Sequence, residues 1–309
     1  MRKGRVEEVR PQLIAVENVS FSYDNRVLAL DQANMAIPRG GKVVILGANG
    51  AGKSTLFLHL NGILKPKSGR VLVEGQQVEY SRGHLSELRK KVGILFQDPD
   101  QQLFSVNVFQ DISFGPMNLK YSAAEVKRRV EQAMEITKVA DLQGRPTHQL
   151  SHGQKKRVAI AGVLAMDPEV IILDEPTASL EPCLVEEMIE LFETLHQAGK
   201  TLIMSTHDMD LAYGWADLCF VLNQGSVVAH GTPEEIFGDQ LLLKRNNLQP
   251  PWVLKVHEKL TAMGLLAPSA HPPRTEAQLF ALMNCIDTSD IRRKSNAELH
   301  LARNTTAKS

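Results

Sequence analysis

The sequence is poor in cysteine and in aromatic residues. Its 309 residues include three cysteines, and aromatic side chains make up 5% of the chain. The cysteines, Cys183, Cys219 and Cys285, form neither a disulfide framework nor a Cys-x-x-Cys metal pair. This excludes a disulfide-rich secreted fold and is typical of a protein in a reducing cytoplasm.

The chain also lacks an excess of either charge and any long apolar run. Lysine plus arginine and aspartate plus glutamate each total 35, so no general attraction to nucleic acid or anionic membrane is expected. The longest apolar run, Val158 to Met166, has nine residues, far fewer than the roughly 20 that cross a bilayer. The basic start has no apolar stretch after it, unlike a signal peptide. We therefore expect a cytoplasmic chain that would need partners to work at a membrane.

Short runs rich in β-branched residues alternate with helical patterns along most of the chain. This alternation predicts an α/β fold with buried central strands. Helical patterns dominate from about residue 97 to 165, which indicates a helical insertion. We expect a main domain over residues 12–240, a small helical C-terminal domain over 241–286, and a disordered tail over 287–309.

The strongest chemical signal is the glycine-rich stretch GANGAGKST, between an expected strand and an expected helix. It matches the phosphate-binding pattern G-x-x-x-x-G-K-[ST] in the required context. Lys53 can reach the β and γ phosphates of ATP, and the hydroxyl of Ser54 can bind Mg²⁺. A glycine turn with a chance lysine is the alternative. The expected nucleotide-binding residues here are Gly47, Ala48, Asn49, Gly50, Ala51, Gly52, Lys53, Ser54 and Thr55.

A second signal is EVIILDEP, an apolar strand that ends in two acids. Asp174 can bind Mg²⁺, and Glu175 can polarise a water molecule that attacks the γ phosphate. Paired acids before Pro176 could instead start a helix. The glycine-rich loop upstream favours the catalytic interpretation.

The stretch LSHGQ, residues 150–154, offers a hydroxyl, a glycine and an amide at the start of a helical segment, where an anion can bind. With the two motifs above, it makes residues 12–240 resemble the ATP-binding subunits of ABC transporters. That family has a P-loop NTPase fold with a central mixed sheet, and its subunits dimerise head to tail. The resemblance implies that Ser151 and Gly153, with Gln154 beside them, hold the γ phosphate of ATP bound to the partner subunit.

The same resemblance assigns further residues. Gln97, at the end of ILFQ, matches the Q-loop glutamine of the family, His207 matches the switch histidine, and Tyr23 matches the aromatic that stacks on adenine. Taken singly, Tyr23 could be a packing residue and His207 a capping residue. The expected catalytic residues are Glu175, His207, Lys53 and Gln97. The expected Mg²⁺ ligands are Ser54, Gln97 and Asp174.

Two positions depart from the family pattern. His152 stands where the first glycine of LSGGQ is usual, and Glu181 stands where the stretch ASLEP usually has aspartate. Because Gly153 is retained, close approach to a phosphate is preserved, and we expect the imidazole of His152 to point away from the nucleotide. The longer Glu181 bears on how two sites communicate rather than on ATP binding.

The stretch after Gln97, FQDPDQQLFSVNVFQDISFGPMNL, is similar to that of energy-coupling factor importers. In that family this region forms a groove for helices of the membrane subunit, and the C-terminal helices support dimerisation. Phe104, Phe109 and Phe114 could line such a groove or belong to the core of the insertion. The segment from Leu150 onward is most similar to the cobalt-type branch, with nickel and vitamin importers as alternatives.

The resemblance thus implies an ATPase that uses Mg²⁺ and powers import of a divalent metal ion, first of all cobalt, as a peripheral protein on the cytoplasmic face of the cell membrane. Expected partners are a second ATPase subunit in a homodimer, a transmembrane coupling protein and a substrate-binding membrane subunit, without nucleic acid. Soluble DNA-repair and translation ATPases are the alternative from another class. Repair proteins insert a long coiled coil where here only 98 positions separate Lys53 from Ser151, and translation factors carry two cassettes.

Overall fold

The computed structural model describes residues 12–24, 27–267 and 271–286. The larger of its two sheets has six strands in the order β10-β9-β3-β8-β7-β6. Strands β9, β3, β8, β7 and β6 run parallel, and β10 is antiparallel to β9, so the sheet is mixed as predicted. The strands span β3 (Lys42–Leu46), β6 (Val92–Leu95), β7 (Val170–Asp174), β8 (Thr201–Ser205), β9 (Leu218–Asn223) and β10 (Ser226–Gly231).

A second, antiparallel sheet has the order β2-β1-β4-β5. Its strands span β1 (Gln12–Phe21), β2 (Leu30–Pro38), β4 (Ser68–Val73) and β5 (Gln76–Gln77). Strand β2 was not predicted, because Asp31, Gln32 and Asn34 interrupt its apolar residues, and the division into two sheets was not predicted either.

Strand β3 shows why the larger sheet is buried on both faces. Val43 and Ile45 belong to the core between the two sheets, which also contains residues of α1 (Lys53–Leu60). Val44 and Leu46 point to the opposite face and join a core formed with the helices there. A strand covered on both sides reads as a continuous apolar run because neighbouring side chains alternate between faces.

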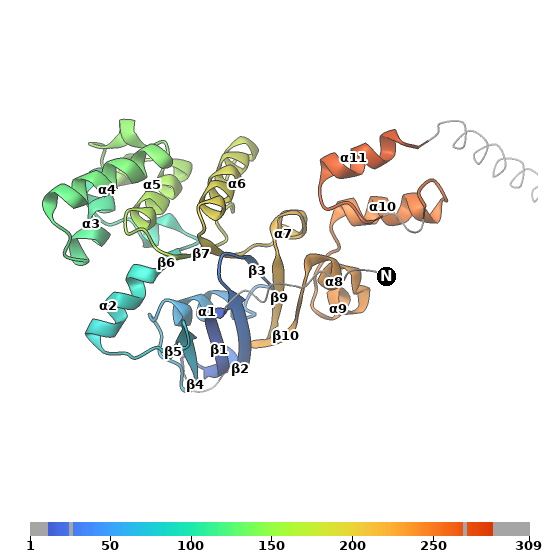
Figure 1. Ribbon diagram of the computed structural model, residues 1–309, viewed down its shortest axis with the longest axis horizontal. Coiled ribbons are helices and arrows are strands. Elements are labelled where there is room, and N and C mark those ends of the chain that lie inside the picture. The colour runs from blue at the N-terminus through green and yellow to red at the C-terminus, as the bar shows by residue number, and fades with distance from the viewer. Residues whose placement is uncertain (1–11, 25–26, 268–270, 287–309) are drawn as a thin grey trace, which may run out of the picture.

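Helices fill the region between β6 and β7 at one end of the molecule (Figure 1). They have a core of their own that includes Val108, Ile112, Val130 and Val158. This confirms the predicted fold class, an α/β P-loop NTPase with a helical insertion. The helices up to β7 span α2 (Arg82–Lys91), α3 (Val108–Asn118), α4 (Ala123–Ile136) and α5 (His152–Leu164), with short 3₁₀ turns at Pro99–Gln101, Ala140–Leu142 and Thr147–Gln149.

The C-terminal helices lie at the opposite end of the molecule (Figure 1). They add Leu243, Leu254 and Leu279 to the same core as Val44 of the central sheet. The guanidinium of Arg274 donates to the carbonyl oxygens of Tyr213 and Ala216. These hydrogen bonds anchor the segment that leads into the last helix to the end of α7. The helices after β7 span α6 (Pro182–Gln197), α7 (Met209–Trp215), α8 (Pro233–Gly238), α9 (Gln240–Arg245), α10 (Trp252–Ala262) and α11 (Glu276–Asn284).

None of the helices in the described part of the chain combines the length and the apolar character needed to span a bilayer. The predicted tail, residues 287–309, lies outside the described residues.

Candidate active site

The glycine-rich loop lies between β3 and α1, at the carboxyl ends of the parallel strands. Gly47 and Gly52 have φ angles of 150° and 106°. A Cβ at Gly47 would collide with the carbonyl oxygen of Leu222, and one at Gly52 with that of Ala29. Only glycine satisfies both the backbone angle and the close approach at these positions, so the loop can form a tight cradle for phosphate groups.

Lys53 begins α1 and is 8% exposed. Its Nζ donates to the carbonyl oxygens of Gly47 at 2.7 Å and Ala48 at 3.3 Å, so the side chain folds back over the loop. Burial lowers the pKa of this ammonium, and the carboxylates of Glu175 and Asp174 oppose that shift. The ammonium is therefore held against the glycine-rich loop.

Asp174 is the last residue of β7 and is buried. Its Oδ1 accepts a hydrogen bond from the hydroxyl of Ser205 at 2.6 Å, and the same hydroxyl accepts one from the backbone N–H of Glu175 at 3.0 Å. Ser205 thereby orients both acidic residues. This role of Ser205 was not predicted, because Ser205 reaches Asp174 only through the parallel pairing of β7 with β8.

Glu175 has a φ of 45°, in the left-handed region that non-glycine residues rarely adopt. Its side chain is 9% exposed, and Oε1 lies 3.1 Å from Nε2 of His207. Oε2 accepts a hydrogen bond from the backbone N–H of His207 at 3.3 Å. Burial raises the pKa of this carboxyl, while His207 and Lys53 lower it. A buried carboxylate with a histidine beside it can act as a base toward water.

Tyr23 is 65% exposed, which leaves its ring free to stack. The hydroxyl lies 3.2 Å from Oγ1 of Thr55, and the ring meets Phe21 edge to face at 5.1 Å between centroids. Gln97 follows β6. Tyr23 and Gln97 both line a cavity of about 380 Å³, which we call the nucleotide pocket. Its lining residues are Tyr23, Ala29, Asn49, Gly50, Ala51, Gly52, Lys53, Ser54, Thr55, Gln97, Asp174, Glu175 and His207.

The LSHGQ residues lie elsewhere, at the start of α5, and are not among the described residues that line the nucleotide pocket. Ser151 and Gln154 form a capping box: the Ser151 hydroxyl accepts from the Gln154 N–H at 3.3 Å, and the Gln154 Oε1 accepts from the Ser151 N–H at 3.0 Å. A Cβ at Gly153 would collide with the side chain of Leu184 on α6. Leu184 is only partly buried, so its side chain could move aside, and this contact by itself does not require glycine.

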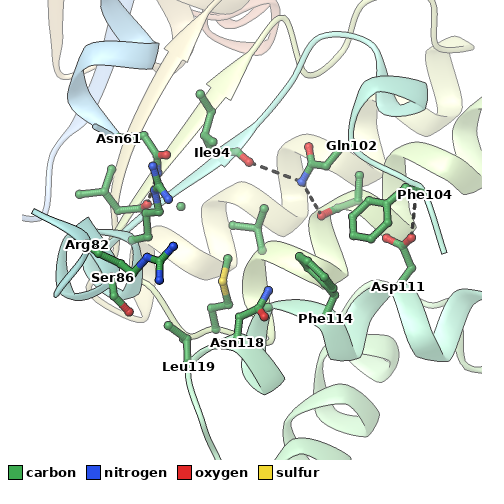
Figure 2. A pocket seen from close by; sticks show the side chains of 18 residues that line it. Asn61, Arg82, Ser86, Ile94, Gln102, Phe104, Asp111, Phe114, Asn118 and Leu119 are labelled. Carbon is green, nitrogen blue, oxygen red and sulfur yellow. Dashed lines mark hydrogen bonds between the residues drawn. The ribbon is translucent and has the colours of Figure 1, made fainter. Parts of the chain in front are cut away.

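A second cavity, of about 470 Å³, lies between α2, β6, α3 and α5. We call it the apolar groove; Figure 2 shows Phe104 and Phe114 on one side and Arg82 on the other. Phe104 and Phe114 are 64% and 48% exposed, and their rings meet edge to face at 4.6 Å between centroids. Phe109 instead packs against the core of the inserted helices. Two of the three aromatic residues that the sequence left open therefore line a groove.

Comparisons with known proteins agree with this geometry. The family model described as ABC transporter matches residues 30–178. The cobalt import ATP-binding protein CbiO of Rhodobacter capsulatus is 45% identical over 271 residues, which cover 88% of this chain and 97% of that protein. The energy-coupling factor transporter ATP-binding protein EcfA2 of Methanospirillum hungatei is 42% identical over 284 residues, covering 92% and 71%.

Among solved structures, CbiO1 of Clostridium perfringens, described as part of the ABC transporter complex CbiONQ, superposes with a TM-score of 0.68. It is 45% identical, and the match covers 81% of this chain and all of that one. Its likeness extends from the fold to the sequence. The chain therefore belongs to the ABC transporter ATP-binding proteins, and it is an ATPase of that family.

Proposed function

We propose that the chain powers import of a divalent metal ion, cobalt first among the candidates, by hydrolysing ATP beneath membrane partner proteins. The assembled nucleotide pocket carries the ATPase part of this proposal, since loop, paired acids and His207 line one cavity. The choice of cobalt as cargo is supported by the Rhodobacter relative. Its name states cobalt import, and the chain spans almost all of its length. Nickel and vitamin importers are the alternatives within the same mechanism.

The pocket suits ATP with Mg²⁺. The hydroxyl of Ser54, the amide oxygen of Gln97 and the carboxylate of Asp174 are the oxygen ligands that Mg²⁺ prefers beside substrate phosphates. Bound there, the ion would neutralise developing charge on the phosphates. The Ser205 hydrogen bond keeps one Asp174 oxygen occupied and orients the carboxylate.

Within this pocket each residue has a distinct task. Tyr23 stacks on the adenine, and the loop residues 47–55 hold the phosphates. Glu175 polarises the attacking water, with Gln97 positioned near it. His207 and Lys53 stabilise the charge that develops on the transferred phosphoryl group.

A second copy of the chain would complete the binding site for the γ phosphate. Ser151, Gly153 and Gln154 stand outside the nucleotide pocket of their own chain, at a helix N-terminus that favours an anion. A head-to-tail dimer gives these residues a nucleotide to contact. Closure of such a dimer around two ATP molecules, and its opening after hydrolysis, would supply the motion that drives transport.

The apolar groove is the place where we expect the transmembrane coupling protein to bind. Its exposed Phe104 and Phe114 are the kind of apolar surface that a partner covers. The groove is lined in part by strand β6, and Gln97 follows that strand in the sequence. The chain would thus sit as a peripheral protein on the cytoplasmic face of the cell membrane, with a substrate-binding membrane subunit and no nucleic acid.

The experiment is to purify the chain with its membrane proteins from native membranes, identify them by mass spectrometry, and measure ATP-dependent uptake of radioactive cobalt in vesicles of that complex. Cobalt uptake that unlabelled cobalt suppresses, and the Glu175→Gln variant abolishes, is the expected result. Uptake of nickel or a vitamin instead would change the cargo and keep the mechanism. Recovery with ribosomes or DNA, without membrane proteins, would contradict transport.

The shared site has a test of its own in size-exclusion chromatography. Glu175→Gln, which keeps ATP but cannot hydrolyse it, should form dimers when ATP and Mg²⁺ are added. Ser151→Arg in the same background should bind ATP and remain monomeric. ATP-dependent dimers of the Ser151→Arg chain would contradict the shared site.

A further inference from the structure

Two adjacent lysines at the start of α5 have opposite environments. Lys155 is partly exposed, and its Nζ pairs with Oδ1 of Asp100 at 2.6 Å. Lys156 is completely buried, and its Nζ donates to the carbonyl oxygen of Gln97 at 2.6 Å and to that of Glu175 at 3.3 Å. A buried ammonium is costly unless its donors are hydrogen-bonded, so the fold must keep these two carbonyls in place.

Both carbonyls belong to residues of the nucleotide pocket. Gln97 follows β6 and Glu175 follows β7, and those two strands are paired in the sheet. Lys156 reaches them from a different element, the helix that begins at LSHGQ. One side chain therefore joins α5 to the two strand ends that carry the expected water-activating residues.

The backbone at Glu175 has an unfavourable conformation that its hydrogen bonds, including the one from Lys156, hold in place. Its φ of 45° is unfavourable for glutamate. Its N–H is held by the hydroxyl of Ser205, and its carbonyl accepts from Lys156 and from the backbone N–H of Ala178 at 3.2 Å. The peptide groups on both sides of the Glu175 side chain are thus fixed, and with them the direction of the carboxylate.

We propose that Lys156 is a positioning residue for hydrolysis: its ammonium ties the backbone of Gln97 and Glu175 to α5, so that seating of Ser151 on the partner's nucleotide sets the geometry of the water-activating groups in its own chain. The inference rests on the proposed function, which places Ser151 against the ATP of a second copy. Lys156 itself does not touch the nucleotide, because it is buried behind the pocket wall.

The surrounding charges are consistent with an ammonium at this place. Burial lowers the pKa of Lys156, and neighbouring carboxylates, Asp174 foremost, oppose that shift. Carbonyl oxygens only accept hydrogen bonds, so an apolar side chain cannot replace the contacts. A lysine that merely filled space would, when replaced, lower stability and leave turnover per folded molecule unchanged.

The test compares Lys156→Met with Lys155→Met, which removes the same group from the neighbouring, partly exposed position. We expect Lys156→Met to lower kcat by about 10- to 100-fold, because displacement of reacting groups by about 1 Å costs that much. Its KM for ATP should stay within about twofold, since the phosphate and adenine contacts are untouched. Lys155→Met should keep both constants within about twofold.

A second readout separates positioning from loss of the dimer. In the Glu175→Gln background, Lys156→Met should still form ATP-dependent dimers in size-exclusion chromatography. Retention of kcat within about twofold of Lys155→Met would overturn the inference, and so would loss of ATP-dependent dimers. If Glu175→Gln alone fails to dimerise with ATP, the shared site of the proposed function fails, and with it the link to Ser151; the comparison of kcat then decides the positioning of Glu175 alone.

Lys156→Gln is the alternative variant if Lys156→Met does not fold. Its neutral amide avoids a buried charge, and its shorter side chain cannot span both carbonyl oxygens. A smaller loss of kcat, with KM unchanged, supports the positioning role. Wild-type kcat in a folded Lys156→Gln chain would contradict the need to hold both carbonyls.

Discussion

The nucleotide pocket and the apolar groove are cavities of similar size in one chain, but they are built differently. In the pocket, Lys53, Asp174 and Glu175 are buried and held by hydrogen bonds to neighbouring groups. In the groove, Phe104 and Phe114 project into solvent and contact each other. Pre-oriented polar groups suit chemistry on a small charged substrate, whereas exposed aromatic rings suit a partner that covers them. The contrast indicates that the two cavities serve separate steps, and substitutions should affect them independently.

Glu175→Gln should have the largest effect, and it should be confined to the pocket. Loss of the base is expected to lower kcat by about 1,000-fold, with ATP still bound, because the amide keeps the size of the side chain. Phosphate release measures the first quantity, and competition with a fluorescent ATP analogue measures the second. Glu131→Gln on the exposed face of α4 is the control; hydrolysis by Glu175→Gln near the control rate would remove Glu175 from the role of base.

Phe114→Asp should have the next largest effect, and it should be confined to the groove. A charge on an aromatic anchor typically weakens an interface by at least 2 kcal/mol, or about 30-fold. We expect the membrane partners to be lost on purification while basal ATP hydrolysis stays within about twofold. Met117→Asp is the matched control, because Met117 is exposed on the same helix and is not among the residues that line the groove. Equal loss in both variants would mean that the groove has no special part in binding.

Tyr23→Ala should have a moderate effect on the pocket. Stacking of a base on an aromatic ring contributes about 1–3 kcal/mol, so KM for ATP should rise about tenfold with kcat within about twofold. Tyr23→Phe keeps the ring and loses only the contact with Thr55, and it should resemble the wild type. If the phenylalanine variant loses as much as the alanine variant, the hydroxyl rather than the ring is what matters.

The smallest effect concerns α4, in the helical insertion that carries the groove. Hydrogen bonds from Arg128 and Arg129 lower the pKa of Glu125 from 4.5 to about 2. Because the folded-state pKa is depressed, these two ion pairs stabilise the fold above the ordinary pKa, and that stabilisation is lost as pH falls from 4.5 toward 2. Glu125→Gln should slightly lower Tm at neutral pH and flatten its decline in acid. Since solvent reaches all three side chains, high salt should reduce the difference. A difference that salt leaves unchanged would point to packing instead.

The sequence could predict the pocket because its parts are local patterns. The loop and the paired acids each occupy a few consecutive residues whose spacing fixes their geometry. Ser205 and Lys156 could not be predicted in their roles, because their contacts arise where β7 meets β8 and where α5 crosses two strand ends. Those contacts depend on how distant elements pack, which no short pattern records.

The groove was harder to predict for a different reason. Phe109 and Phe114 lie on one helix, and composition alone does not tell which of them faces solvent. The structure separates them, because Phe109 turns toward the core of the inserted helices and Phe114 does not. Gly153 adds a similar lesson: the sequence suggested contact with phosphate, and the structure adds Leu184 of α6 as a neighbour.

The C-terminal helices have a consequence for how the chain folds during synthesis. Leu243, Leu254 and Leu279 complete the core on one face of the central sheet, yet they are made after every strand of that sheet. Until they emerge from the ribosome, Val44 and its neighbours must remain partly uncovered. Nascent chains with such exposed apolar surface are prone to aggregate and are the ones that chaperones bind. We expect ribosomes stalled before Leu279 to carry a chain that proteases cleave readily, and release of the full chain to bring protection.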